Sequence, residues 1–219
     1  MTLLPEGFMY RWVPWGKGKP PYKFVFVAME PTSKYDPSEL YPQPGAFNEP
    51  LRFAIERFMF KPGEPVSYLI TNMAKCSIKT GHACNHTREL RYKNCARFLR
   101  TEVANAGSSS RVISIGKVPK ESLEKDQDRY GLVLNGKPIP WVWHYGFFNT
   151  ARFQKFAREN ESAYSKFRDQ YVCEYEKFLC ADRSVERANQ FNQRPNGDLS
   201  RIFNYSCQMG KILDCHDWF

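Results

Sequence analysis

Four short apolar runs recur along the chain, each bounded by polar or turn-forming residues. They cover residues 23–28 (KFVFVA), 66–71 (VSYLIT), 111–115 (RVISI) and 139–143 (IPWVW). Runs of this length, rich in Val, Ile and aromatic residues, are typical of β-strands. Because their apolar residues are continuous rather than alternating, they predict a sheet that is covered on both faces.

Helical patterns separate these predicted strands. Asn48-Glu49-Pro50 is a suitable helix start, with a polar cap followed by proline in the first turn. A second helix is predicted from Thr87 to Ala106-Gly107. Aromatic residues then recur at largely helical spacing from Phe153 through residue 180, and we interpret this stripe as core packing.

The alternation of strands and helices is typical of a mostly parallel sheet with right-handed crossovers. We therefore predict an α/β fold, a three-layer α/β/α arrangement around a central, mostly parallel four-stranded sheet. The domain is expected to span residues 1–180. Residues 181–219 are expected to form a C-terminal extension packed on the same domain.

Charge points to a polyanionic partner. The 219 residues carry 32 Lys and Arg against 23 Asp and Glu, a formal net charge of +9. Such a field favours binding to nucleic acid and makes that binding dependent on salt. No window approaches the ~18 apolar residues of a membrane span, and the N-terminus lacks a signal-peptide pattern. We expect a cytoplasmic protein, associated with the nucleoid in a prokaryote, and no membrane partner.

Polar residues follow the predicted strands in turn. Glu30 follows the first strand, Asn72 ends the second, Gly116-Lys117 follows the third, and His144 follows the fourth. Ligands of open α/β sheets bind beyond the carboxyl ends of the strands. Each residue also has a structural explanation: a surface ion pair for Glu30, a turn for Asn72, and a hydrogen-bonded core position for His144. Their joint placement favours a site for a small polar heterocycle.

Four of these segments resemble motifs of the uracil-DNA glycosylase superfamily, closest to its iron–sulfur branch. They are VFVAMEPT, YLITNMAKC, RVISIGK and WVWHYGFF, in the family's order within residues 22–160. Three departures stand out. Ala28 replaces the usual Gly, Glu30 stands where the uracil-specific branch has Asp, and Tyr145-Gly146 replaces Pro-Ser after the histidine.

The resemblance implies a role for each matching residue. Glu30 would orient the attacking water or stabilise the oxocarbenium-like sugar. Asn72 would read a pyrimidine edge, since an amide offers both a donor and an acceptor. His144 would donate to the base carbonyl as negative charge develops there. Phe47 would stack on the flipped base. The expected DNA contacts are the wedge residues Tyr145, Phe147 and Phe148, together with Arg152 and Lys117.

Seven cysteines without an export signal indicate reduced thiols or metal ligands. Cys76 and Cys95 resemble two ligands of the iron–sulfur branch, although the branch's N-terminal cysteine pair is missing. Cys84 lies between them. The alternatives are a structural [4Fe–4S] cluster, a zinc site to which His82 or His86 contributes, and buried thiols. No cofactor is required for the expected chemistry.

The leading hypothesis is a monofunctional DNA glycosylase, acting as a monomer in repair or in defence against foreign DNA. It would flip a base out of DNA, uracil or a modified pyrimidine, and hydrolyse its N-glycosidic bond to leave an abasic site. The first alternative is a catalytically inactive DNA-binding module of the same fold. The second is an α/β hydrolase or transferase acting on a nucleotide. It ranks last because the chain lacks G-x-x-x-x-G-K-[ST] and G-x-S-x-G motifs.

Overall fold

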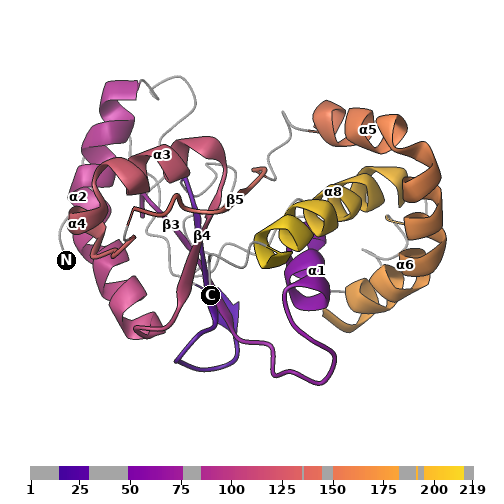
Figure 1. The fold of residues 1–219 in the computed structure, drawn as a ribbon, viewed down its shortest axis with the longest axis horizontal. Helices are drawn as coiled ribbons and strands as arrows, with labels where there is room; N and C mark the ends of the chain where they lie inside the picture. The colour runs from indigo at the N-terminus through magenta and orange to yellow at the C-terminus, as the bar shows by residue number, and fades with distance from the viewer. Residues whose placement is uncertain are drawn as a thin grey trace. The chain divides into compact units, whose positions relative to one another are not determined.

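A computed structural model describes residues 15–29, 49–75, 85–134, 136–144, 150–182, 191 and 195–214 (Figure 1). The chain divides into two compact units. One, here called the sheet unit, comprises Met1–Gln43 and Pro65–Val142. The other, the helical unit, comprises Pro44–Glu64 and Trp143–Phe219. The predicted α/β class is confirmed, because a mostly parallel sheet and several helices make up the described residues.

The sheet has five strands in the order β1-β3-β2-β4-β5. Four of them are parallel and correspond to the predicted runs: β2 (Phe24–Ala28), β3 (Tyr68–Asn72), β4 (Arg111–Ile115) and β5 (Trp141–Val142). The fifth, β1 (Trp15–Lys17), pairs antiparallel with β3 at the edge. The predicted count of four was therefore one too low. The segment WGK has no apolar run that would mark it as a strand.

Glycine makes the pairing of β1 feasible. A Cβ atom at Gly16 would collide with the carbonyl oxygen of Tyr68 on β3. Because glycine has no side chain, the backbone of β1 can approach β3 closely enough to pair with it.

One face of the sheet is covered by the helices α2 (Asn85–Ala106), α3 (Lys117–Lys125) and α4 (Gln127–Tyr130). Their core includes Val25, Val27 and Leu69 from the strands, with Leu99 and Leu123 from the helices. The opposite face of the strands carries Phe24, Phe26 and Tyr68, which are also fully buried. Among the described residues of the sheet unit, the helices lie on the first face.

Four helices of the helical unit surround an aromatic core: α1 (Glu49–Phe58), α5 (Thr150–Glu159), α6 (Glu161–Asp182) and α8 (Pro195–Asp214). The ring of Phe53 lies 5.2 Å from that of Tyr175 and 5.4 Å from that of Phe178, centroid to centroid. The predicted helix start at Glu49-Pro50 is confirmed. The aromatic stripe forms two helices that meet at Asn160. Phe153 is fully buried as interpreted, whereas Phe156, Phe167 and Phe178 are half-buried and contact other aromatic rings.

The segment expected to be an extension contains a long helix. Within α8, Leu199, Ile202 and Met209 are buried, and the helix packs against α1, α5 and α6. Pro195 is its first residue, a position that proline favours because its missing N–H would be unsatisfied there. Among the residues that the structure describes, no helix is long and apolar enough to cross a membrane.

Candidate functional site

The carboxyl ends of the parallel strands meet at one edge of the sheet, here called the carboxyl edge. Ala28 is in register with Asn72, and Ile115 with Val142. Backbone pairing continues past the strands, since the Met73 N–H donates to Ala28 O at 2.8 Å and the Ala74 N–H to Met29 O at 3.0 Å. The chain therefore leaves β2 toward Glu30 alongside the segment that follows Asn72. Glu30 itself lies outside the described residues.

The strand order reverses between β2 and β4. From β2 the chain moves to β3 on one side, and then crosses to β4 on the other. Adjacent strands whose connections leave in opposite directions form the topological switch point at which α/β sheets bind ligands. The segments that leave this switch point begin at Met29 and at Gly116. The predicted candidates Glu30 and Lys117 are the next residues along those segments.

Gly116 ends β4 with a φ of 104°, a backbone conformation that residues with a Cβ rarely adopt. Its N–H donates to Val142 O at 2.8 Å, and its carbonyl accepts from Ser114 Oγ at 2.8 Å. Lys117 follows in the first turn of α3. Its side chain is 72% exposed and lies 3.4 Å from Glu121 in an ion pair. Lys117 is thus a surface cation next to the carboxyl edge.

Asn72 is the most unusual residue at this edge. It is fully buried, yet neither its amide nitrogen nor its amide oxygen has a hydrogen-bond partner among the described residues. A buried polar group without a partner costs about 1–3 kcal/mol, and such groups are rare in folded proteins. The turn-closing explanation for Asn72 does not hold within this part of the chain, because its side chain bonds to no backbone group there.

A buried polar network lies beside Asn72. Lys75 Nζ donates to Glu102 Oε2 and, at 2.5 Å, to Thr71 Oγ1, and that hydroxyl also bonds Glu102 Oε2 at 2.5 Å. Burial lowers the pKa of Lys75, while the carboxylate of Glu102 opposes that shift. The network ties the end of β3 to α2. The sequence places Lys75 just after the second predicted strand, but its partner Glu102 could not be identified without the fold.

Cys95 is the one predicted metal ligand within the described residues. It is 8% exposed, and its Sγ accepts a hydrogen bond from the Lys75 N–H at 3.3 Å. An N–H···S bond suits a metal-bound thiolate and also a buried thiol. Cys76, the residue after Lys75, and Cys84 lie outside the described residues. Within the described ranges, no three His, Cys, Asp or Glu side chains form a group that could hold a metal ion.

His144 belongs to the helical unit and lies two residues beyond the end of β5. Burial lowers its pKa from 6.5 to about 4, so its imidazole is neutral at physiological pH. The preceding residue, Trp143, is held on three sides. Its N–H donates to Gln208 Oε1 at 2.8 Å, its ring lies 5.5 Å from that of Phe153, and the Arg152 guanidinium lies 5.0 Å from its ring centroid.

A side-chain relay on α8 supports this arrangement. Gln208 Nε2 donates to Asn204 Oδ1 at 2.6 Å, which fixes the amide of Gln208 with its oxygen toward Trp143. Sequence reasoning missed both α8 residues, because they lie 60 and 64 positions after His144. Arg152, predicted as a DNA contact, stacks on Trp143 instead of extending freely into solvent, although it is exposed.

The predicted site residues fall into three groups. Asn72, Lys117 and Cys95 belong to the sheet unit, and His144 and Arg152 to the helical unit, and each unit is described by itself. The remaining candidates lie outside the described residues, namely Glu30, Phe47, Cys76, Cys84, Tyr145, Phe147 and Phe148. Comparison of the sequence with known protein families and with curated proteins finds no match in either.

Proposed function

We propose that this chain is a monofunctional DNA glycosylase that flips a pyrimidine, uracil or a modified base, out of DNA and hydrolyses its N-glycosidic bond. The observation that carries the proposal is the buried amide of Asn72, which has neither donor nor acceptor satisfied within the described residues. An amide held in this way is available to a ligand with an adjacent acceptor and donor, such as the edge of a pyrimidine.

The fold supports this placement of a ligand. Asn72 ends β3, next to the strand β2 at which the order of the sheet reverses. We propose that the complete protein is a three-layer α/β/α monomer of the uracil-DNA glycosylase type and acts in the cytoplasm on DNA. Its net charge of +9 favours such a polyanionic substrate.

The proposed reaction breaks the bond between the sugar C1′ and the base nitrogen. The bonding electron pair leaves with the base, which departs as an anion. Water adds to the oxocarbenium-like sugar, and the proton that it loses ends on the base anion. Glu30 would orient that water and stabilise the positive sugar. Asn72 and the His144 N–H would stabilise the negative charge that develops on the carbonyl oxygens of the departing base.

The low pKa of His144 fits this role. At a pKa of about 4, His144 is a neutral imidazole at pH 7. A neutral N–H donor strengthens its hydrogen bond as the carbonyl becomes an oxyanion, without a prior cost of burying an imidazolium. Phe47 would stack on the flipped base, and Tyr145, Phe147 and Phe148 would fill the gap in the duplex.

The test is a panel of oligonucleotides that carry uracil, thymine mismatches, or hydroxymethylated or glycosylated pyrimidines. Each is incubated with protein and then with alkali, which cleaves the strand at abasic sites. We expect at least one cleaved substrate, and a loss of about 100-fold or more in rate for Asn72→Ala.

Ser114→Ala is the matched control. Ser114 is also a buried polar residue near the carboxyl edge, but its hydroxyl is satisfied by Gly116 O. We expect this variant to lose stability rather than base release. DNA that is retained by the protein but never cleaved would favour the inactive DNA-binding module. Equal rates for Asn72→Ala and wild type would refute the assignment of the site.

A further inference from the structure

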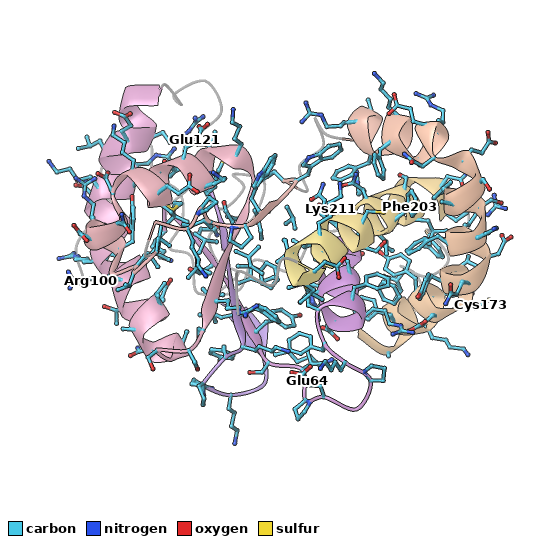
Figure 2. The ribbon with its side chains drawn as sticks, in the orientation of Figure 1. Glu64, Arg100, Glu121, Cys173, Phe203 and Lys211 are labelled. Atoms are coloured by element: carbon cyan, nitrogen blue, oxygen red, sulfur yellow. The ribbon has the colours of Figure 1, made fainter. Side chains whose placement is uncertain are left out.

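The outer face of α2 carries a row of cations. Lys93, Arg97 and Arg100 are four and three residues apart, which places them on one side of the helix. All three are exposed, and none forms an ion pair among the described residues. Arg100, labelled in Figure 2, lies on the flank of α2 next to the end of α4, since a Cβ atom at Gly131 would be 3.1 Å from Arg100 Cγ. We call these three residues the α2 strip.

Acidic residues of α2 itself do not neutralise the α2 strip. The helix contains two glutamates, and Glu102 is engaged with the buried Lys75. Glu89 is exposed near the start of the helix. A face with three cations near one acid attracts polyanions, and its binding should weaken steeply with salt.

Apolar side chains flank the α2 strip. Leu90 is 50% exposed and Phe98 is 37% exposed, and both lie on the same helix. The guanidinium of Arg97 stacks 4.7 Å from the ring centroid of Phe98. Stacking on the ring restricts the rotamers of the Arg97 side chain. The central cation of the strip is therefore ordered before it meets a ligand.

The α2 strip begins level with the carboxyl edge. The Lys75 N–H, three residues past β3, donates to Cys95 Sγ on α2, and Lys93 lies two residues before that cysteine. The other end of α2 lies at the opposite edge, because the Tyr22 N–H, just before β2, donates to Ala106 O at 2.7 Å. The strip thus runs from the edge with Asn72 down the outer side of the sheet unit.

We propose that the α2 strip binds the phosphate backbone of duplex DNA. Lys93 and Arg100 are seven residues apart, or about 10.5 Å along the helix axis at 1.5 Å per residue. Phosphates of one strand of B-DNA advance about 3.4 Å along the duplex axis per nucleotide, so the α2 strip is about as long as three nucleotide steps of one strand. The choice of DNA as the partner rests on the proposed function. The cationic surface itself is observed independently of that function.

The experiment compares two triple variants of the full chain. The first replaces the α2 strip with glutamines, Lys93→Gln, Arg97→Gln and Arg100→Gln. The control removes the same charge from exposed lysines of the helical unit, Lys61→Gln, Lys166→Gln and Lys177→Gln. The probe is a fluorescein-labelled 20-base-pair duplex without any modified base, and its fluorescence anisotropy is followed from about 50 to 300 mM KCl. Thermal melting checks that both variants fold.

The α2 strip variant should bind the duplex on the order of 100-fold more weakly at 0.1 M salt. Its plot of log affinity against log salt should be less steep than that of wild type by about 2.7, since each phosphate that the protein no longer neutralises removes about 0.9 from the slope. The control should keep the wild-type slope. Equal slopes for the two triple variants would overturn the proposal. Competition by poly-glutamate as effective as by DNA would also overturn it, in favour of an acidic protein partner.

This outcome is separable from the proposed catalysis. Asn72→Ala should abolish base release and leave the salt slope unchanged. If no substrate is ever cleaved but the α2 strip variant loses its salt-dependent binding, the glycosylase proposal is wrong. The proposal that the α2 strip binds duplex DNA is then still supported.

Discussion

The backbone N–H of Trp143 donates to the side-chain oxygen of Gln208, 65 residues later in the chain, at 2.8 Å. The same amide is anchored through its nitrogen to Asn204 Oδ1 at 2.6 Å. Gln208 therefore sets the path of the backbone at the residue that precedes His144. A misplaced catalytic group can lose about 100-fold in rate for a shift of about 1 Å.

Removal of this anchor should slow base release more than it weakens the fold. We expect Gln208→Leu to lower the rate about 10- to 100-fold, because the backbone at Trp143 is no longer held. Gln208→Glu keeps the acceptor and should recover most of the rate. Ser206→Ala on the same helix removes a hydroxyl that donates to Phe203 O and is not the acceptor of the Trp143 N–H, and serves as the control. If Gln208→Leu releases the base at the wild-type rate, Gln208 does not position the site.

The stability of the protein should depend on the protonation of His144. Its pKa is about 4 in the folded state, against 6.5 for an exposed imidazole. Between these values the unfolded state binds more protons, so the free energy of unfolding falls as the pH decreases from about 6.5 to about 4. This group contributes at most about 3 kcal/mol to that loss.

The measurement is urea unfolding at pH 7 and at pH 4.5 for wild type and His144→Gln. The variant should lose about 2–3 kcal/mol less than wild type between these pH values. An identical loss in both proteins would mean that His144 titrates at its ordinary pKa.

Loss of one partner of the buried pair Lys75 and Glu102 should lower the free energy of unfolding strongly, whereas replacement of both partners by apolar residues should lower it little. Their side chains are 7% and 16% exposed, respectively. Glu102→Leu alone leaves an unpaired buried ammonium and should destabilise the fold by about 3–5 kcal/mol. The double variant Lys75→Met/Glu102→Leu should recover most of that loss, since no charge is then buried. A double-mutant cycle from urea unfolding measures the coupling. Additive losses would show that the two charges act independently.

Metal analysis tests the predicted role of Cys95. If a cluster or zinc is bound, anaerobically purified wild-type protein should contain iron or zinc, and an iron–sulfur cluster should absorb near ~400 nm. Cys95→Ser should lower the metal content, whereas Cys173→Ser, at an exposed free cysteine, should not. Wild-type protein without metal would leave Cys95 as a buried thiol that accepts the Lys75 N–H.

Sequence patterns located the central strands because buried parallel strands are continuous apolar runs. Residues 111–115 coincide with β4, and residues 23–28 and 66–71 overlap β2 and β3. The run 139–143 overstated β5, which is only Trp141–Val142, because Ile139 is buried but its N–H donates to Glu124 Oε1 at 2.7 Å instead of to β4. Apolar patterning records burial, and burial extends beyond the hydrogen-bonded ladder.

Elements with little apolar patterning were missed for the same reason. The helix α3 has the sequence KVPKESLEK, in which Pro119 and Leu123 are the buried residues, so its pattern is that of a link. The position of Asn72 at a strand end could be predicted, but its lack of a partner could not. Hydrogen-bond satisfaction depends on every neighbour of the side chain, and those neighbours come from distant segments.

The interleaving of the two units constrains the order in which the chain can acquire structure during synthesis. Residues of α1 are made early, yet this helix packs against α8, and 137 positions separate Phe58 from Pro195 (195 − 58). Contacts so distant in sequence form late. The part of the α1 face that packs against α8 therefore stays exposed until α8 has left the ribosome. Ribosome-bound chains truncated before α8 would expose an aromatic surface and be targets for chaperones.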